Sequence, residues 1–237
     1  MIVQVSRQIF ALLLVAAPLS LLAPADGAQY QHMAPVPSYL MSDRQAEIDL
    51  ARTAAPPSVS ADADVLALGS HGYETAVKGT NGFVCLVERS WASPFNDPEF
   101  WNPKERSPNC FNPPAARTEL PRLLKQTQWA LSGFTLQQII EKTKVAVADH
   151  SFGPPETGAF SFMLSKKGYL SDAAGGPWYP HVMFFVQRDQ VDSWAPNRAG
   201  SPVLSQDRGE FESALIFIPV RRWSDGSPAV PVAQVNS

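Results

Sequence analysis

Residues 83–89 constrain the fold more than any other segment, because they have the composition of a β-strand with apolar side chains on both faces. Successive residues of a strand point to opposite sides of a sheet. Val84, Leu86 and Glu88 therefore share one face, and Phe83, Cys85, Val87 and Arg89 share the other. This pattern predicts a strand that is central in its sheet and covered on both sides.

The segments around this strand predict a hairpin. Residues 73–77 are also rich in β-forming residues, and Asn81-Gly82 is a preferred tight-turn pair. We therefore expect residues 73–77 and 83–89 to pair across this turn. The other expected elements are a helix opened by Ser42 in a capping box with Gln45, a strand at 64–68, helices at 116–131 and 135–148, and strands at 159–164, 182–188 and 213–220.

This order of elements predicts an α+β fold in a single domain spanning residues 42–226. Strands that cluster on either side of a helical pair are typical of an antiparallel sheet with helices on one face. We expect about five or six strands and two or three helices on that face. The order also loosely resembles that of PAS, Cache and profilin-like domains, in which a hairpin, a helical crossover and a three-stranded run make one sheet.

The first 28 residues predict a secretory signal peptide. Arg7 precedes an apolar core at 9–23, and Ala25-Asp26-Gly27 supplies the small residues of a cleavage site. The core is shorter than the ~20 apolar residues that span a bilayer, and no later segment is long enough. We expect a secreted protein, periplasmic or extracellular, with a flexible or loosely docked tail at 29–41 and a C-terminal tail at 227–237.

Two cysteines in an oxidising compartment predict one disulfide, between Cys85 and Cys110. The alternative is a pair of unlinked thiols, one of them buried as a small hydrophobe.

Residues 90–116 predict a long loop, because they contain six prolines and no periodic pattern. Five aromatic residues in this segment argue against disorder. They can form a small satellite core beneath the loop, or they can stack on a planar ligand or sugar. The first interpretation is preferred.

The charge pattern excludes some partners. The formal net charge is −3 and no run of Lys and Arg occurs, so we expect no nucleic-acid partner. No zinc signature occurs either, so we predict no metal site, and no cofactor is indicated. A small-molecule ligand remains the expected partner, and the oligomeric state stays open.

Three segments resemble a group of uncharacterised secreted bacterial proteins. They are HGYETAVKGTNGFVCLVERSW at 71–91, CFNPPAAR at 110–117, and GYLSD with HVMFF at 168–185. The resemblance implies export and a broad lineage, but no activity, cofactor or catalytic residue.

The strongest candidate site lies at 172–181. A flexible Gly175-Gly176 pair precedes Trp178 and Tyr179, which offer flat faces to a ligand. His181 follows at the start of an apolar strand, where it can act as general base or metal ligand with Asp172 orienting it. The alternative is a hairpin loop in which Trp178 caps the core and His181 forms a local hydrogen bond.

A second candidate pairs His71 with Glu74 for catalysis. Residues three apart in a strand point to opposite faces, so a turn at Gly72 would have to bring them together. The alternative is a polar rim.

Three functions follow from these sites. The leading hypothesis is an exported small-molecule-binding protein. The alternatives are an exported hydrolase that uses His181 with Asp172 or His71, and an envelope interaction module that uses the 90–116 segment. Whether the chain is an enzyme stays open.

Overall fold

The computed structural model describes residues 30–211 and 213–229. The predicted signal peptide at 1–28 and residues 230–237 of the predicted C-terminal tail lie outside these residues. Within them, eight strands form one sheet in the order β2-β1-β3-β4-β5-β6-β8-β7. The strands are β1 (Asp64–Gly69), β2 (Gly72–Val77), β3 (Val84–Glu88), β4 (Ser107–Phe111), β5 (Phe160–Met163), β6 (His181–Gln187), β7 (Leu204–Asp207) and β8 (Ser213–Pro219).

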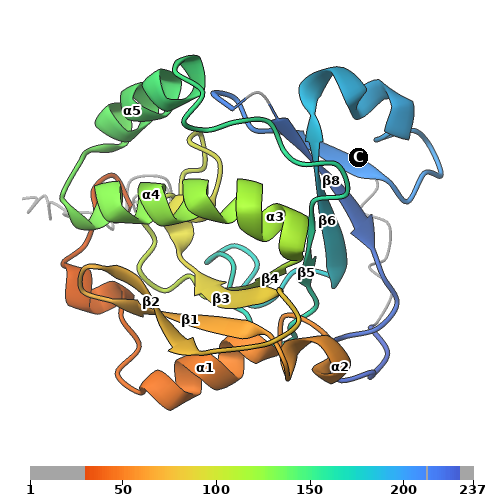
Figure 1. Cartoon of the computed structure of the whole chain (residues 1–237), viewed down its shortest axis with the longest axis horizontal. Coiled ribbons are helices and arrows are strands. Elements are labelled where there is room, and N and C mark those ends of the chain that lie inside the picture. The colour runs from red at the N-terminus through yellow and green to blue at the C-terminus, as the bar shows by residue number, and fades with distance from the viewer. Residues whose placement is uncertain (1–29, 212, 230–237) are drawn as a thin grey trace, which may run out of the picture.

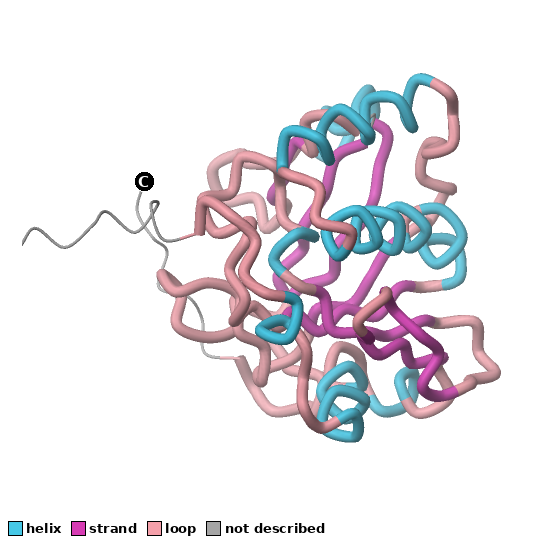
Figure 2. The backbone as a smooth tube through the Cα atoms, turned by 90° about the vertical axis from the view of Figure 1, so that its left-hand side faces the viewer, coloured by secondary structure: helices cyan, strands magenta, loops and turns pink. Residues whose placement is uncertain are grey.

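The fold is α+β, but the sheet is larger than the five or six strands predicted. Helices lie across it and beside it, and the strands turn strongly from β1 to β8 (Figures 1 and 2). The α-helices are α1 (Arg44–Arg52), α2 (Pro57–Ser60), α3 (Pro113–Thr118), α4 (Leu120–Leu131) and α5 (Leu136–Ala148). Short 3₁₀ segments are η2 (Val36–Tyr39), η3 (Ser90–Ala92) and η4 (Arg188–Trp194).

Helices cover both faces of the sheet, so the prediction of helices on one face is wrong. Cys85 and Val87 of β3 pack in one buried cluster with Ile48 of α1. Leu86, between them in sequence, packs on the opposite side with Leu123 of α4. The alternation predicted for this strand is confirmed, and it requires a helical layer on each side. We call these sides the α1 face and the α4 face.

The predicted hairpin is wrong in its pairing. β2 pairs antiparallel with β1 through a two-residue turn at Ser70-His71, and β3 lies parallel to β1 on its other side. The sheet is therefore mixed rather than purely antiparallel. The connection from β2 to β3 crosses the start of β1, where the backbone N–H groups of Thr80 and Asn81 donate to the carbonyl of Asp62. Gly82 has the positive φ (75°) expected from its sequence, but in this crossover.

The 90–116 segment is not one loop. It contains η3, the start of α3 and the fully buried strand β4, which lies between β3 and β5. Strand β4 was missed because its sequence, SPNCF, contains a proline and an asparagine, which strands disfavour. Trp91, Phe100 and Trp101 are buried in one cluster, so the satellite-core interpretation is confirmed for these three aromatics.

The 29–41 segment is docked rather than flexible, as far as residues 30–41 are described. Tyr39 is fully buried against Trp91, and its hydroxyl donates to the carbonyl of Trp101 at 2.8 Å. Tyr30 is also buried. This docking could not be predicted from the sequence, because the segment lacks periodicity.

Helix boundaries agree with the sequence in part. Asp43, not Ser42, caps α1 and accepts from the backbone N–H groups of Gln45 and Ala46. The predicted 116–131 helix is two helices, α3 and α4, which meet at Glu119. The capping box between Thr135 and Gln138 at the start of α5 is confirmed.

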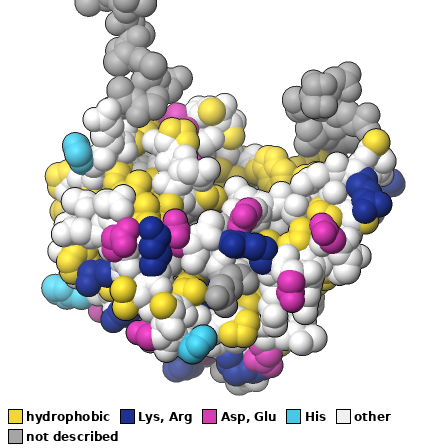
Figure 3. Space-filling view, turned by 90° about the horizontal axis from the view of Figure 1, so that it is seen from above, with side chains coloured by type: hydrophobic (Ala, Val, Ile, Leu, Met, Phe, Trp, Pro, Cys, Tyr) yellow, Lys and Arg dark blue, Asp and Glu magenta, His cyan; other side chains and the backbone are white. Residues whose placement is uncertain are grey.

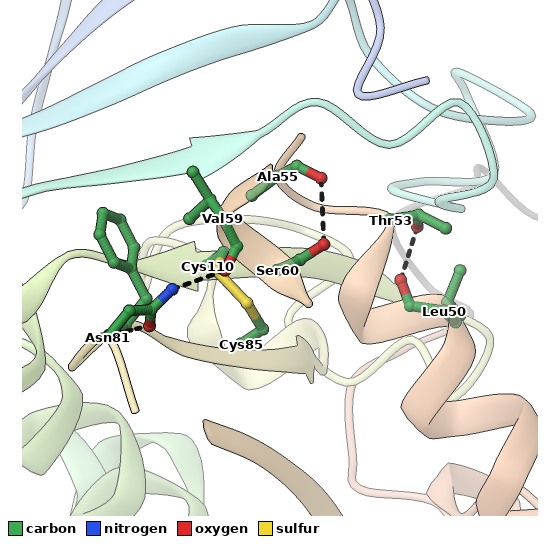
Figure 4. Close-up of a disulfide and its surroundings, with 9 residues drawn as sticks. Leu50, Thr53, Ala55, Val59, Ser60, Asn81, Cys85 and Cys110 are labelled. Carbon is green, nitrogen blue, oxygen red and sulfur yellow. Dashed lines mark hydrogen bonds between the residues drawn. A yellow bond between two sulfur atoms is a disulfide. The ribbon is translucent and has the colours of Figure 1, made fainter. Parts of the chain in front are cut away.

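The Cys85–Cys110 disulfide is present, as predicted. The two cysteines are directly paired residues of β3 and β4, and both are fully buried on the α1 face. Figure 4 shows the bond beside α2, where Nδ2 of Asn81 donates to the carbonyl of Val59 at 2.7 Å. The bond therefore joins two inner strands of the sheet.

None of the described helices is long and apolar enough to cross a membrane. Seen from above, Lys and Arg side chains lie next to Asp and Glu side chains with hydrophobic atoms between them (Figure 3).

Candidate functional site

A cavity of about 650 Å³ lies on the α4 face of the sheet. Its floor consists of side chains that alternate along the strands, and α4, the 92–97 segment and the β7–β8 connection contribute its walls. The apolar lining includes Phe95, Phe111, Met163, Met183, Phe185, Phe211, Leu215 and Phe217. A cavity of this size and composition fits a small organic molecule.

Four acidic residues line the cavity: Glu88, Asp97, Glu105 and Glu119. The Glu88 carboxylate accepts from Nδ2 of Asn109 at 3.0 Å, and the Glu105 carboxylate accepts from Oγ of Ser107 at 2.8 Å. Glu88 and Ser107 are paired residues of β3 and β4, so the two carboxyls lie at one corner of the cavity. Burial raises the pKa of Glu88 to about 7 and that of Glu105 to about 8.

A buried ionic cluster also lines the cavity. Glu119 accepts from Arg208 at 2.7 Å and lies 3.5 Å from Arg122, and both guanidinium groups reach Oγ of Ser213. The guanidinium of Arg208 also lies over the Phe211 ring, 4.5 Å from its centroid. These arginines are already held by the protein's own groups.

His181 lines the cavity at the start of β6 and is only 3% exposed. Its ring packs edge-on against Trp178 and Phe217, with centroids 4.7 and 5.4 Å away. Nδ1 lies 2.8 Å from the carbonyl of Tyr179. A carbonyl only accepts hydrogen bonds, so Nδ1 carries the proton. Burial lowers the pKa of His181 to about 4, so the ring is neutral near pH 7 and its Nε2 is an acceptor.

Of the other candidate residues at 172–181, only Trp178 lines the cavity. Trp178 lines the cavity and is 40% exposed, whereas Tyr179 is not among the lining residues. Asp172 is bound elsewhere: it accepts from Tyr30 at 2.6 Å and from Tyr169, and it pairs with Lys104 at 3.0 Å. The hydroxyl of Tyr169 holds the pKa of Asp172 well below its usual range. The structure therefore does not bring Asp172 to His181.

His71 and Glu74 lie away from the cavity. His71 is exposed in the β1–β2 turn. Glu74 is exposed on β2, 3.8 Å from Arg44 of α1. Neither residue lines the cavity that holds His181. The polar-rim alternative describes both residues.

Comparison with protein-family profiles, with curated proteins and with solved structures finds no match. The resemblance to secreted bacterial proteins and the loose likeness to PAS, Cache and profilin-like domains stay predictions. The site must be interpreted from its own chemistry.

The cavity combines an apolar floor with a few polar side chains. Among the described residues, no three His, Cys, Asp or Glu side chains are arranged to hold a metal ion. This cavity can bury the apolar body of a ligand. The polar groups that it offers to the ligand are the carboxyls of Glu88 and Glu105, the Nε2 acceptor of His181, and the guanidinium groups of Arg122 and Arg208.

Sequence reasoning missed four of these groups: Glu88, Glu105, Arg122 and Arg208. Two of them carried a signal. Glu88 shares its face with Val84 and Leu86, so it is a charge in line with buried positions. Arg122 lies between leucines on the buried stripe of α4. Glu105 and Arg208 lie in segments without periodicity and carried none.

Proposed function

We propose that this chain is an exported binding protein that holds a small molecule with an apolar body in the cavity on the α4 face. The observation that carries this proposal is the cavity itself, whose size lies within the ~300–1,000 Å³ of typical ligand sites. The buried disulfide on the other face fits the oxidising compartment that a signal peptide implies.

The two alternatives have less support. A hydrolase that uses His181 with Asp172 or His71 needs one of these groups beside the imidazole, and both lie elsewhere. An interaction module needs the aromatic residues of 90–116 at the surface, whereas Trp91, Phe100 and Trp101 are buried.

The proposal is tested with the neutral fluorescent probe N-phenyl-1-naphthylamine. Ala92 lines the cavity, so Ala92→Trp should fill part of it and weaken binding by about tenfold, equal to ~1.4 kcal/mol. Ala61 is exposed just after α2, so Ala61→Trp makes the same chemical change outside the cavity and should leave affinity within about twofold.

Fluorescence titration of the wild-type chain and both variants gives the answer. Saturable binding that Ala92→Trp weakens and Ala61→Trp does not would support the proposal. A probe that fails to bind the wild-type protein, or that binds both variants equally well, would overturn it.

A further inference from the structure

The carboxyl pair at the corner of the cavity lacks a counter-charge. Among the described residues, neither Glu88 nor Glu105 forms an ion pair, whereas Glu119 in the same cavity has two arginines. Each of the two carboxyls has one neutral hydrogen-bond donor, on Oε1. No described group donates to Oε2 of either residue. Glu105 as a whole is only 5% exposed, and its carboxyl lies at the cavity wall.

Such an arrangement is costly for the free protein. A buried carboxylate without a cation loses its hydration and gains little in return. The raised pKa values of Glu88 and Glu105 express the same cost, since the protein keeps the proton instead of the charge. A ligand that carries a positive charge would remove this cost.

We propose that the ligand is an organic cation whose ammonium group binds between Glu88 and Glu105 while its apolar body lies along the aromatic floor of the cavity. This inference rests on the proposed function, because it names the ligand class for the same cavity. When the ammonium binds, each carboxyl that is still protonated releases its proton to solvent, and two carboxylates face one cation.

Three features favour an ammonium over other charged ligands. Glu88 and Glu105 supply two carboxyls. Among the described residues, no three His, Cys, Asp or Glu side chains are arranged to hold a metal ion. Phe95, Phe111 and Phe211 line the same cavity as the pair, and aromatic ring faces attract cations. An anion would meet the two carboxyls, and the two arginines of the cavity are held by Glu119 and Ser213.

The charged groups around the pair define its pH response. Asp97 and Glu99, on the segment before Glu105, raise the pKa of Glu105 together with Glu88, after the larger effect of burial. Arg208 lowers the pKa of Glu88, after burial has raised it. Further charged or titratable groups nearby are Arg106 at the start of β4, Glu119 and Arg122 around α4, and His181.

The test compares three probes that share a phenyl ring: 2-phenylethylamine, the neutral 2-phenylethanol and the anionic 3-phenylpropionate. Titration calorimetry at pH 7 in two buffers of different ionisation enthalpy gives both affinity and proton release. We expect the amine to bind about tenfold or more tightly than the alcohol, with protons released, and the acid to bind most weakly.

Variants assign the effect to the pair. Glu88→Gln and Glu105→Gln should lower the amine's affinity to that of the alcohol and leave the alcohol's affinity within about twofold. Glu141→Gln is a matched control, because Glu141 is exposed on α5 and belongs to a different surface. If either cavity variant is unstable, the wild-type protein still decides. The ratio of amine to alcohol affinity should rise between pH 6 and pH 8, because ionised carboxyls face the amine directly.

The outcomes separate the two proposals. If the alcohol binds and the amine binds no more tightly, or without proton release, the cation inference is overturned while the cavity remains a binding site. If N-phenyl-1-naphthylamine also fails to bind, the proposed function falls with it.

Discussion

Glu88 and Arg89 are neighbours in sequence, yet they belong to opposite faces of the sheet and to opposite kinds of site. Arg89 is fully buried beside α1, where its guanidinium bonds to Glu47 at 2.8 Å and to the carbonyl of Tyr39 at 2.7 Å. Glu47 in turn accepts from the backbone N–H of Leu68. Glu88 faces the cavity with one neutral donor and, among the described residues, forms no ion pair.

The faces differ in the same way as the two residues. The α1 face is filled by a cluster that includes the disulfide, Val87 and Ile48, and its buried charges are compensated. The α4 face leaves a cavity, and two of its carboxyls have no counter-charge. A compensated buried charge is a structural element, whereas an uncompensated one beside a cavity identifies the place where a ligand can supply what the protein lacks.

The largest expected effect is on the α1 face. Arg89→Met should destabilise the protein by about 3–5 kcal/mol, because it leaves the Glu47 carboxylate buried without its cation. Urea unfolding measures the loss, and the double variant Arg89→Met, Glu47→Gln should recover part of it. A single variant as stable as the wild type would show that the pair is not structural, and the comparison would break.

The next effect concerns the disulfide. Replacing Cys85 and Cys110 together by alanine should cost about 3 kcal/mol, because the unfolded chain is no longer closed into a loop. The bond lies on the α1 face, so affinity for N-phenyl-1-naphthylamine at 20 °C should stay within about twofold if the variant remains folded. Loss of binding by a variant that still unfolds cooperatively would contradict the separation of the two faces.

The smallest effect is the pH dependence of the α4 face. Folding raises the pKa of Glu88 and Glu105 above that of a free carboxyl, so their contribution to stability is lost as pH rises through about 7 and 8. His181 acts in the opposite direction. Its pKa is lowered to about 4, so its contribution is lost as pH falls below 6.5.

Between pH 6.5 and 8 only the carboxyl effect of these three groups remains. The melting temperature should therefore fall over this range by about 2–4 °C, equal to a change on the order of 1 kcal/mol. The double variant Glu88→Gln, Glu105→Gln should show a flatter profile, and Glu141→Gln should keep the wild-type slope. Equal slopes in all three proteins would mean that these carboxyls titrate normally.

Much of the fold could be predicted where apolar residues follow one period. The alternation of residues 83–89 predicted the two covered faces, and continuous apolar runs predicted β5, β6 and β8. Strand β4 could not be recognised by period, because Pro108 and Asn109 interrupt it. The predicted disulfide could have indicated this strand. A bond from Cys85, in a strand, places the segment around Cys110 beside that strand.

Strand pairing was the part that local sequence could not decide. Asn81-Gly82 favours a tight turn, but Asp62 and Asp64 accept hydrogen bonds from residues 79–81 and hold that segment across β1. These contacts join residues 15 to 19 positions apart, so no short window of the sequence shows them. The site residues also differ in whether local sequence could identify them. His181 and Trp178 were predicted at a strand end and line the cavity, whereas Glu105 depends on tertiary contacts alone.

The strand order has a last consequence, for how copies of this protein meet one another. In the described sheet the outer strands are β2 and β7. An open strand edge can template aggregation when it is long, flat and apolar. Strand β7 has four residues and ends in exposed Gln206 and Asp207, and β2 exposes Glu74 and Thr75 beside a register shift in β1. Both edges therefore disfavour edge-to-edge addition of a second sheet, and the strands with the most apolar sequences, β3, β6 and β8, are enclosed between neighbours.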